Sequence, residues 1–168
     1  MSDNNHLLST QAETPPVTSE EVKLLAQIGF LAATSGYVVP AIRLFEGLRV
    51  LRPGQAFPYI GLALARMTVG AFQDAVRVLR EEGLRTVPEN EEIQVYLGLA
   101  LALAKQPQDA QRLLCALLAK NHLDTHQVDL AQGIQAQIEG HAAQKMHPKP
   151  AKVIELSGNN KLKKQSVC

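Results

Sequence analysis

The amino-acid sequence predicts an all-α protein built from tandem helical hairpins. Ala and Leu, two strong helix formers, dominate its hydrophobic residues, whereas aromatic residues make up 4% of the chain and Trp is absent. A β-sheet protein would use more Val, Ile, Thr and aromatic residues. In addition, small residues and prolines recur through the middle of the chain at intervals of 34 or 35 residues. Such a regular interval indicates a repeated structural unit.

Four series of residues share this interval. They are Gly36 and Gly70; Ala41, Ala75 and Ala110; Pro53 and Pro88; and Gly29, Ala63 and Gly98. A period near 34 is typical of the tetratricopeptide repeat, in which each unit is two antiparallel helices joined by a tight turn. Helix backbones approach closely only where side chains are small, so the Gly and Ala series should mark the crossings. The sequence therefore predicts three tetratricopeptide-like hairpins in a right-handed superhelix.

Local signals place the ends of the helices. Thr18 and Glu21 form a capping box, which predicts a helix start at residue 19. Gly36 and Gly70 should end the first helix of their hairpins, and residues 105–107 should do so in the third. Proline cannot continue a helix interior, so one proline closes each of the first two hairpins. We expect hairpin helices at about 19–35, 38–51, 56–69, 72–86, 90–104 and 108–120.

A seventh helix is predicted at about 124–143. Apolar residues recur there at helical spacing, namely Val128, Ala131, Ile134 and Ile138. A terminal repeat needs a cover, so this helix should cap the open end of the stack. The helical domain is thus expected over 19–143, between a polar segment 1–18 and a basic tail 144–168. Both flanks are expected to be disordered, although residues 153–156 could dock as a strand or turn.

Composition excludes several classes of function. The tail carries six Lys and one Glu, so the net charge of +1 hides a nearly neutral body, which argues against nucleic-acid binding. No uncharged apolar run is long enough for a membrane span, and no secretory signal is visible. Two cysteines, far apart in sequence, form no disulfide framework. These features predict a cytoplasmic protein without integral membrane association.

Catalysis and cofactor binding have no support in the sequence. His122 and His126 straddle a predicted helix start and lack the further ligands of a zinc site. Cys115 lies in an apolar run and is expected to be a buried small hydrophobe. No nucleophile–base arrangement or phosphate-binding glycine loop is present. We therefore expect no catalytic residues, no metal and no cofactor, and the protein should not be an enzyme.

The first helix of each hairpin should line the concave face of the stack. With the Gly29 series packed inward, the exposed stripe is mostly apolar. It includes Ala26, Phe30, Phe57, Ile60, Leu64, Met67, Val95 and Leu99. An apolar lining not needed for packing indicates a surface that binds an extended or helical peptide. Two alternatives remain open: the seventh helix or the tail fills this groove, or the stripe is one residue out of register and belongs to the core.

Three stretches resemble a known family. Residues 47–53, 57–66 and 69–75 are similar to the small tetratricopeptide proteins of bacterial type III secretion systems. These include translocator chaperones of the LcrH/SycD class and proteins of the YscY and YscG class. The resemblance implies a cytoplasmic chaperone or export adaptor that binds an apolar segment of a protein partner. It places the binding surface on Phe30, Tyr59, Ile60, Leu64, Met67 and Leu99.

The partner classes implied are a secreted substrate, a small export partner or a component of the export gate. The predicted first helix already belongs to a repeat, without a long preceding dimerisation helix, and this favours the YscY-like reading. A homodimer and a heterodimer both remain open. One alternative is a scaffold subunit of a larger assembly that uses its convex face, with Arg43, Arg49 and Arg77. Another is a regulatory domain whose basic tail contacts a membrane.

Overall fold

The computed structural model describes residues 17–120 and 123–146, with the backbone alone for 141–146. All regular elements of these residues are helices. They are α1 (Ser19–Thr34), α2 (Val38–Leu51), α3 (Phe57–Thr68), α4 (Phe72–Arg77), η1 (Val78–Gly83), α5 (Leu84–Thr86), α6 (Glu91–Leu103), α7 (Pro107–Ala119) and α8 (Thr125–Met146). Since α4, η1 and α5 form one continuous run, these are the seven predicted helices, and the predicted all-α fold class is confirmed.

The flanking segments bear on the predicted domain limits. Of the segment 1–18, only residues 17 and 18 are described, and of the tail 144–168 only residues 144–146. Those three tail residues belong to α8, which ends three residues beyond the predicted limit of 143. The predicted disorder of both flanks, and the docking of residues 153–156, lie outside the described residues.

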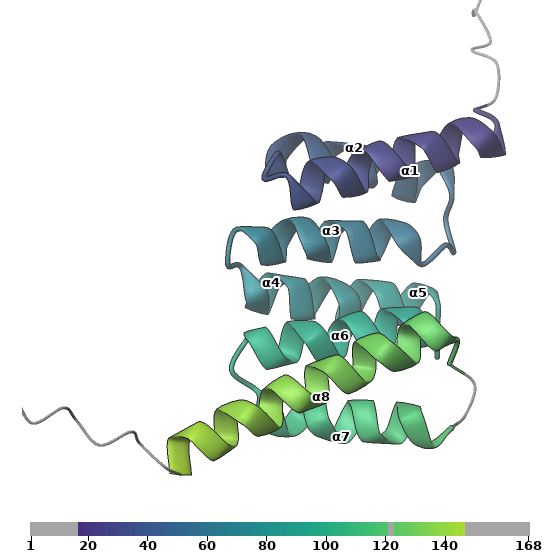
Figure 1. Ribbon diagram of the computed structural model, residues 1–168. Helices are drawn as coiled ribbons and strands as arrows, with labels where there is room; N and C mark the ends of the chain where they lie inside the picture. Colours follow the sequence, from purple (N-terminus) through teal and green to yellow (C-terminus); the bar gives the residue numbers. More distant parts are fainter. Residues whose placement is uncertain (1–16, 121–122, 147–168) are drawn as a thin grey trace, which may run out of the picture.

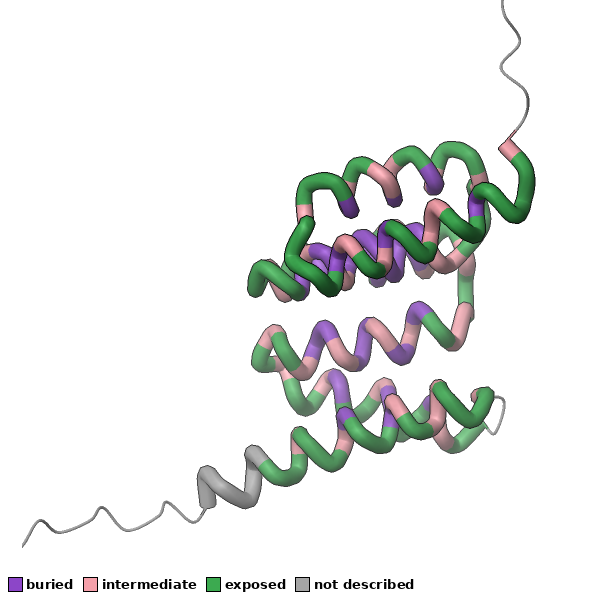
Figure 2. Tube along the Cα trace, turned by 45° about the horizontal axis from the view of Figure 1, so that its top comes forward, coloured by how far each residue is buried: buried purple, intermediate pink, exposed green. Residues whose placement is uncertain are grey.

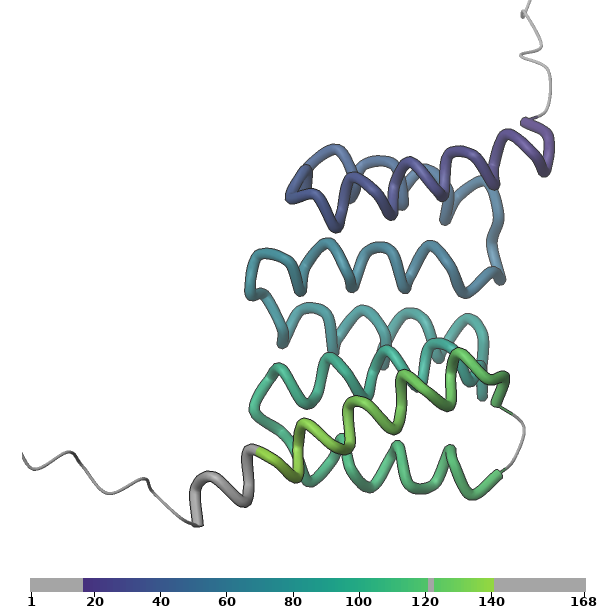
Figure 3. The backbone as a smooth tube through the Cα atoms, in the orientation of Figure 1, coloured from purple at the N-terminus to yellow at the C-terminus, as the bar shows by residue number. Residues whose placement is uncertain are grey.

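The hairpins stack along one axis (Figures 1 and 3). Each helix packs on its sequence neighbours, and α3 also contacts both α1 and α6. Helix α8 runs obliquely across the last hairpin and contacts α6 and α7 (Figure 1). It therefore covers the end of the stack, as predicted for a capping helix.

The three hairpins turn with one hydrogen-bond pattern. The amide N–H groups of Tyr37, Ala71 and Gln106 donate to the carbonyl oxygens five residues earlier, at 2.9–3.0 Å. The preceding residue in each turn has a positive φ: 85° at Gly36, 77° at Gly70 and 62° at Lys105. The first two are glycines, which adopt this conformation freely. The helix ends predicted at these glycines and at residues 105–107 are confirmed.

The helix crossings pair a small residue with a large one. A Cβ atom on Gly29 would lie 2.8 Å from Cζ of Phe45, and one on Gly98 would lie 2.6 Å from Cδ2 of Leu114. The Ala41, Ala75 and Ala110 series is fully buried, as expected for a close crossing. The large side chain that packs on each glycine comes from the second helix of the hairpin, four residues after its buried alanine: Phe45 follows Ala41, and Leu114 follows Ala110. The small-residue series in the sequence marks the crossings but does not indicate which side chains fill them.

Burial follows one side of the outer helices α1, α2 and α7, whereas six consecutive residues of α3 are buried (Figure 2). Helix α3 is buried most extensively, because α1, α2, α4, η1 and α6 all contact it. Its side chains join three hydrophobic clusters, one shared with Phe45 of α2, one with Leu79 and Leu97 of later helices, and one with Ala33 and Ala41 of the first hairpin. The middle of the solenoid is therefore its best-packed part.

Candidate functional site

A hollow of about 440 Å³ opens between α1 and the start of α3. Among its lining residues are Ala26 and Phe30 from α1 and Phe57 from α3, all three of which the sequence singled out. Lys23 and Arg52 add two cationic side chains to its wall. We refer to this feature as the α1–α3 hollow. It combines apolar side chains with basic groups.

Five of the nine predicted groove residues keep part of their surface accessible. They are Ala26, Phe30, Phe57, Leu64 and Leu99, each half-buried. Phe57 and Leu64 lie two turns apart on the same face of α3, and Leu99 lies at the equivalent place on α6. Phe30 also packs on Phe45, with ring centroids 4.9 Å apart. These residues form an apolar stripe that begins at the α1–α3 hollow.

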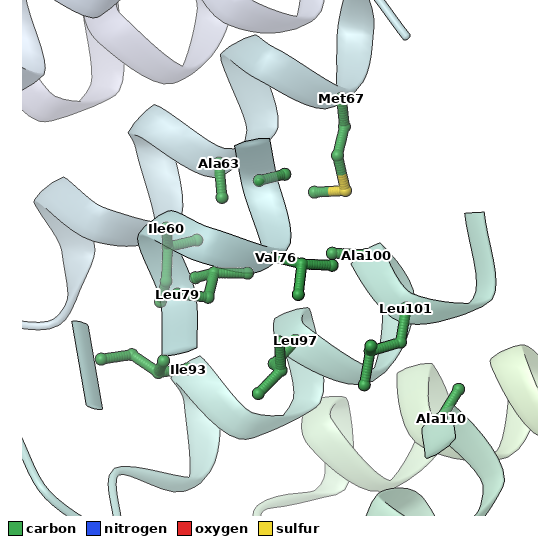
Figure 4. Close-up of a cluster of buried hydrophobic side chains, with 11 residues drawn as sticks. Ile60, Ala63, Met67, Val76, Leu79, Ile93, Leu97, Ala100, Leu101 and Ala110 are labelled. Carbon is green, nitrogen blue, oxygen red and sulfur yellow. The ribbon is translucent and has the colours of Figure 1, made fainter. Parts of the chain in front are cut away.

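The other four predicted groove residues are buried, and this corrects the expectation that they line an open surface. Their exposed fractions are 5% for Tyr59, 1% for Ile60, 8% for Met67 and 1% for Val95. Ile60 and Met67 belong to the central cluster, where Ile60 lies beside Leu79 (Figure 4). The register of the stripe was off by about one position at these residues, because α4 and η1 pack against more of α3 than the periodicity indicated.

Val95 and Tyr59 are buried for different reasons. Val95 packs with Ala131 and Ile134 of α8. The alternative in which the seventh helix fills part of the groove is therefore realised in the third hairpin. Tyr59 packs in the cluster of Phe45 and Leu48 from the first hairpin, and its hydroxyl donates a hydrogen bond to Oγ1 of Thr86 at 3.2 Å. The accessible part of the stripe is consequently concentrated in the first two hairpins.

The third hairpin contributes acidic groups near this face. Partial burial, and secondarily the charge of Asp124, raise the pKa of the Glu92 carboxyl, whereas His126 opposes the shift. Burial and the charge of Glu92 raise the pKa of Tyr96 in turn. Neither Glu92 nor Asp124 forms an ion pair within the described residues. The face thus has a basic end at the α1–α3 hollow and an acidic end at the start of α6.

Helix α1 exposes a second apolar surface. Leu24, Ile28 and Leu31 follow one another at helical spacing and are 57%, 49% and 67% exposed. A central repeat would have a preceding repeat against this face, whereas α1 is the first helix of the described chain. Terminal repeats of solenoids usually carry a polar outer face. We refer to these three residues as the α1 outer stripe.

The convex arginines are mostly engaged within the protein. Arg49 pairs with Glu46 and Glu82, and Arg77 pairs with Asp74 at 2.8 Å. Arg43 is exposed and forms no ion pair in the described part of the chain. The convex face therefore offers fewer unpaired charges than its composition indicated.

Cys115 is exposed, which corrects the expectation of a buried hydrophobe. Helix α7 buries Ala110, Leu114 and Leu117, and Cys115 is one residue past this buried side. Its Sγ accepts a hydrogen bond from Nε2 of Gln135 at 3.0 Å. His122 lies outside the described residues, and within them no three His, Cys, Asp or Glu side chains gather closely enough to hold a metal ion. None of the described helices is long and apolar enough to cross a membrane.

Residues that the sequence did not predict complete the α1–α3 hollow. Arg52 follows α2 and donates to the backbone carbonyl oxygens of Leu51 at 3.0 Å and Val17 at 2.9 Å. Gln55 lies in the connection to α3 and also lines the hollow. No periodic signal marks these positions, because the path of the connection between two hairpins brings them to the groove.

No family model matches the sequence, and no curated protein matches it. Solved structures do show similarity. Two structures of the Yersinia enterocolitica type III secretion translocator chaperone SycD align with TM-scores of 0.61 and 0.59, at 17% and 19% identity. The alignments cover 81% and 75% of this chain and 93% and 97% of the SycD chains. A chain of the CopN–Scc3 complex aligns with a TM-score of 0.55 at 15% identity, covering 81% of this chain and 79% of its own length.

At these identities the alignments establish a shared fold. The resemblance predicted from the sequence is confirmed at that level: the chain is structurally similar to tetratricopeptide chaperones of type III secretion.

Proposed function

We propose that this protein is a cytoplasmic type III secretion chaperone or export adaptor that binds an apolar segment of a protein partner. The observation that carries the proposal is the α1–α3 hollow, where Ala26, Phe30 and Phe57 leave apolar surface accessible. The similarity to SycD and to the CopN–Scc3 complex supports it, since those structures are a translocator chaperone and a protein complex.

The proposed binding is driven by burial of apolar surface. Each Å² of apolar area removed from water contributes about 25 cal/mol, so a few aliphatic side chains seated along the stripe give useful affinity. Ala26, Phe30, Phe57, Leu64 and Leu99 would contact the partner directly. Tyr59, Ile60, Met67 and Val95 would act beneath them, by holding α3 and α6 at the spacing that the groove needs. This role needs no catalytic group, metal or cofactor.

A second protein contact is favoured by the α1 outer stripe. Contiguous exposed apolar side chains on one helix face are uncommon on a protein surface, and they usually mark a contact with another protein surface. The stripe is the described surface best suited to a homodimer or heterodimer contact. The scaffold alternative, which relies on the convex face, is less well supported, because Arg49 and Arg77 already pair within the chain.

Co-purification of the tagged full-length chain from its native host tests the proposal. The variant Ala26→Glu with Phe57→Asp places two charges in the α1–α3 hollow at helix positions that face solvent in part. The matched control is Val50→Asp, which alters a 78% exposed residue of α2. We expect the hollow variant to lose its partner and the control to keep it, with helical circular dichroism unchanged in both. Retention by the hollow variant, with loss on Arg43→Glu, would favour the scaffold alternative instead.

A further inference from the structure

The two ends of the concave face carry opposite, unpaired charge. At the α1–α3 hollow, neither Lys23 nor Arg52 forms an ion pair in the described part of the chain. The guanidinium of Arg52 donates hydrogen bonds to the carbonyl oxygens of Val17 and Leu51. Because these acceptors are neutral, the positive charge of Arg52 is not neutralised by them. This end can therefore receive an anionic group.

At the other end, neither Glu92 nor Asp124 forms an ion pair within the described residues, and the Asp124 carboxylate accepts one hydrogen bond, from the Gln127 amide at 2.8 Å. Glu92 and Asp124 lie close enough for the charge of one to act on the other, and burial and this repulsion raise the pKa of Glu92. His126 offsets the effect only partly. The capping role of Asn90, whose side chain accepts from the Ile93 amide, already satisfies the helix start, so Glu92 is not required as the cap. A positive charge supplied from outside would relieve this repulsion.

The order of these charges follows from the fold. Helices α1, α3, α6 and α8 all begin on the same side of the molecule (Figure 1). Lys23 lies in the second turn of α1, Phe57 opens α3, Glu92 lies in the first turn of α6, and Asp124 immediately precedes α8. The sequence of groups along this side is therefore basic, apolar, acidic. A segment bound along it meets all three in turn.

We propose that the partner segment has an acidic side chain at the end that enters the α1–α3 hollow, an apolar middle, and a basic side chain at the end that meets Glu92 and Asp124. This inference rests on the proposed function and adds the chemistry and the direction of the bound segment. Complementary charges at exposed positions contribute more to orientation and selectivity than to affinity. A segment laid the opposite way would bring like charges together at both ends.

Five synthetic, fluorescently labelled peptides with one six-residue apolar core test the proposal on the full chain. The core is flanked by Asp pairs, by Lys pairs, by Ser pairs, or by Asp and Lys pairs in either order. At low ionic strength we expect one of the two mixed peptides to bind roughly three- to tenfold more tightly than either like-ended peptide. The preference should shrink in 0.5 M salt, where the Debye length is only a few Å.

Charge reversals in the protein provide the second arm. Lys23→Glu should shift the preference toward the peptide with Lys at both ends, and Glu92→Lys toward the peptide with Asp at both ends. Arg43→Glu, on the convex side of α2, is the matched control and should change nothing. Circular dichroism of each variant checks that the helices remain.

Each other outcome counts against the inference in a distinct way. Equal binding of all five peptides, with loss in the Ala26→Glu and Phe57→Asp variant, would overturn the charge order and leave the groove function standing. Binding of none of them would overturn both. A peptide of residues 147–168 that binds more tightly than the mixed peptides would identify the chain's own basic tail as the occupant, and the proposed partner chemistry would be wrong.

Discussion

Phe45 sets the spacing between the first helices at the scale of single residues. Its fully buried ring lies against Gly29 on α1 and Gly61 on α3, and a Cβ on Gly61 would come within 2.2 Å of Cζ. Phe30 of the groove then rests on the same ring. The shape of the α1–α3 hollow thus depends on two glycines and one aromatic side chain beneath it.

Gly61→Ala should therefore destabilise the protein by about 1–3 kcal/mol, because the added methyl group forces Phe45 out of place. Gly47→Ala is the matched control, since a Cβ on this exposed glycine of α2 meets nothing within 4 Å. The control should be stabilised by about 0.5–1 kcal/mol through helix propensity. Urea denaturation measures both. Equal effects at the two positions would show that the ring does not set the spacing.

Lys105 holds a conformation that the other two hairpin turns give to glycine. Lys105→Gly should stabilise the protein by about 0.5–1 kcal/mol, because it relieves a positive φ of 62°. Lys120→Gly, at the end of α7 in ordinary right-handed conformation, should destabilise it by a similar amount. Thermal unfolding distinguishes the two, and a loss of stability on Lys105→Gly would contradict the assignment of strain.

Because of the Glu92 carboxyl, the free energy of unfolding should decrease as the pH rises. Its pKa is raised in the folded chain, so the native state binds more protons, and stability declines as pH rises from the unfolded pKa near 4.5 through the raised value. Glu92→Gln should flatten this part of the profile. The charge of His126 opposes the shift in the Glu92 pKa, which partly offsets the decline. Melting temperatures of both proteins between pH 4 and 7 would show parallel curves if Glu92 were unperturbed.

One helix absorbs an irregularity of the repeat at the scale of elements. Ala41 precedes Pro53 by 12 residues, whereas Ala75 precedes Pro88 by 13. The extra residue of the second hairpin falls in the π-helical turn η1, Val78–Gly83, between α4 and α5. A π turn accommodates one inserted residue, so that the helix before it and the helix after it still direct the same side toward the core. The π turn therefore keeps the Gly and Ala series in place at the helix crossings.

Deletion of the exposed Glu81 should therefore be tolerated, since it removes the insertion and leaves a regular α-helix. Deletion of Arg43, equally exposed but within the regular helix α2, should rotate the following residues by about 100° and unfold the first hairpin. Urea denaturation of each deletion variant shows whether it still unfolds cooperatively. If the Glu81 deletion variant were unfolded, the π turn would not be the place where the extra residue is inserted.

The elements were predictable to the extent that they depend on periodic residues. Helix positions follow from the Gly, Ala and Pro series, and the turn at Lys105 follows from Pro107 without a glycine. The π turn was not predicted, although the change from 34 to 35 residues is visible, because the interval does not say how the extra residue is absorbed. Buried Ile60 and Val95 were misplaced, because periodicity gives a face but not how many neighbours cover it.

At the scale of the whole molecule, α8 divides the concave face. It covers Val95 in the third hairpin and leaves the α1–α3 hollow accessible. The stack thus has one closed end, at α8, and one end with exposed apolar residues, at α1. This asymmetry separates two surfaces, the groove and the α1 outer stripe, on different sides of the first helix.

The two surfaces should be separable by substitution. Ile28→Asp should abolish any self-association or second contact through α1 while leaving capture in the groove intact, because Ile28 does not line the hollow. Analytical ultracentrifugation of the variant, together with the peptide-binding assay, measures both properties. Loss of peptide binding with unchanged helicity would mean that the two surfaces form a single site.

Site-specific photo-crosslinking in the native host tests the groove most directly. A benzoylphenylalanine placed at Phe57 lies in the α1–α3 hollow, and one placed at Val50 lies on the exposed face of α2. We expect the Phe57 probe to crosslink to a type III secretion partner through an apolar segment, identified by mass spectrometry, and the Val50 probe not to do so. Crosslinks from Val50 alone would contradict binding in the groove.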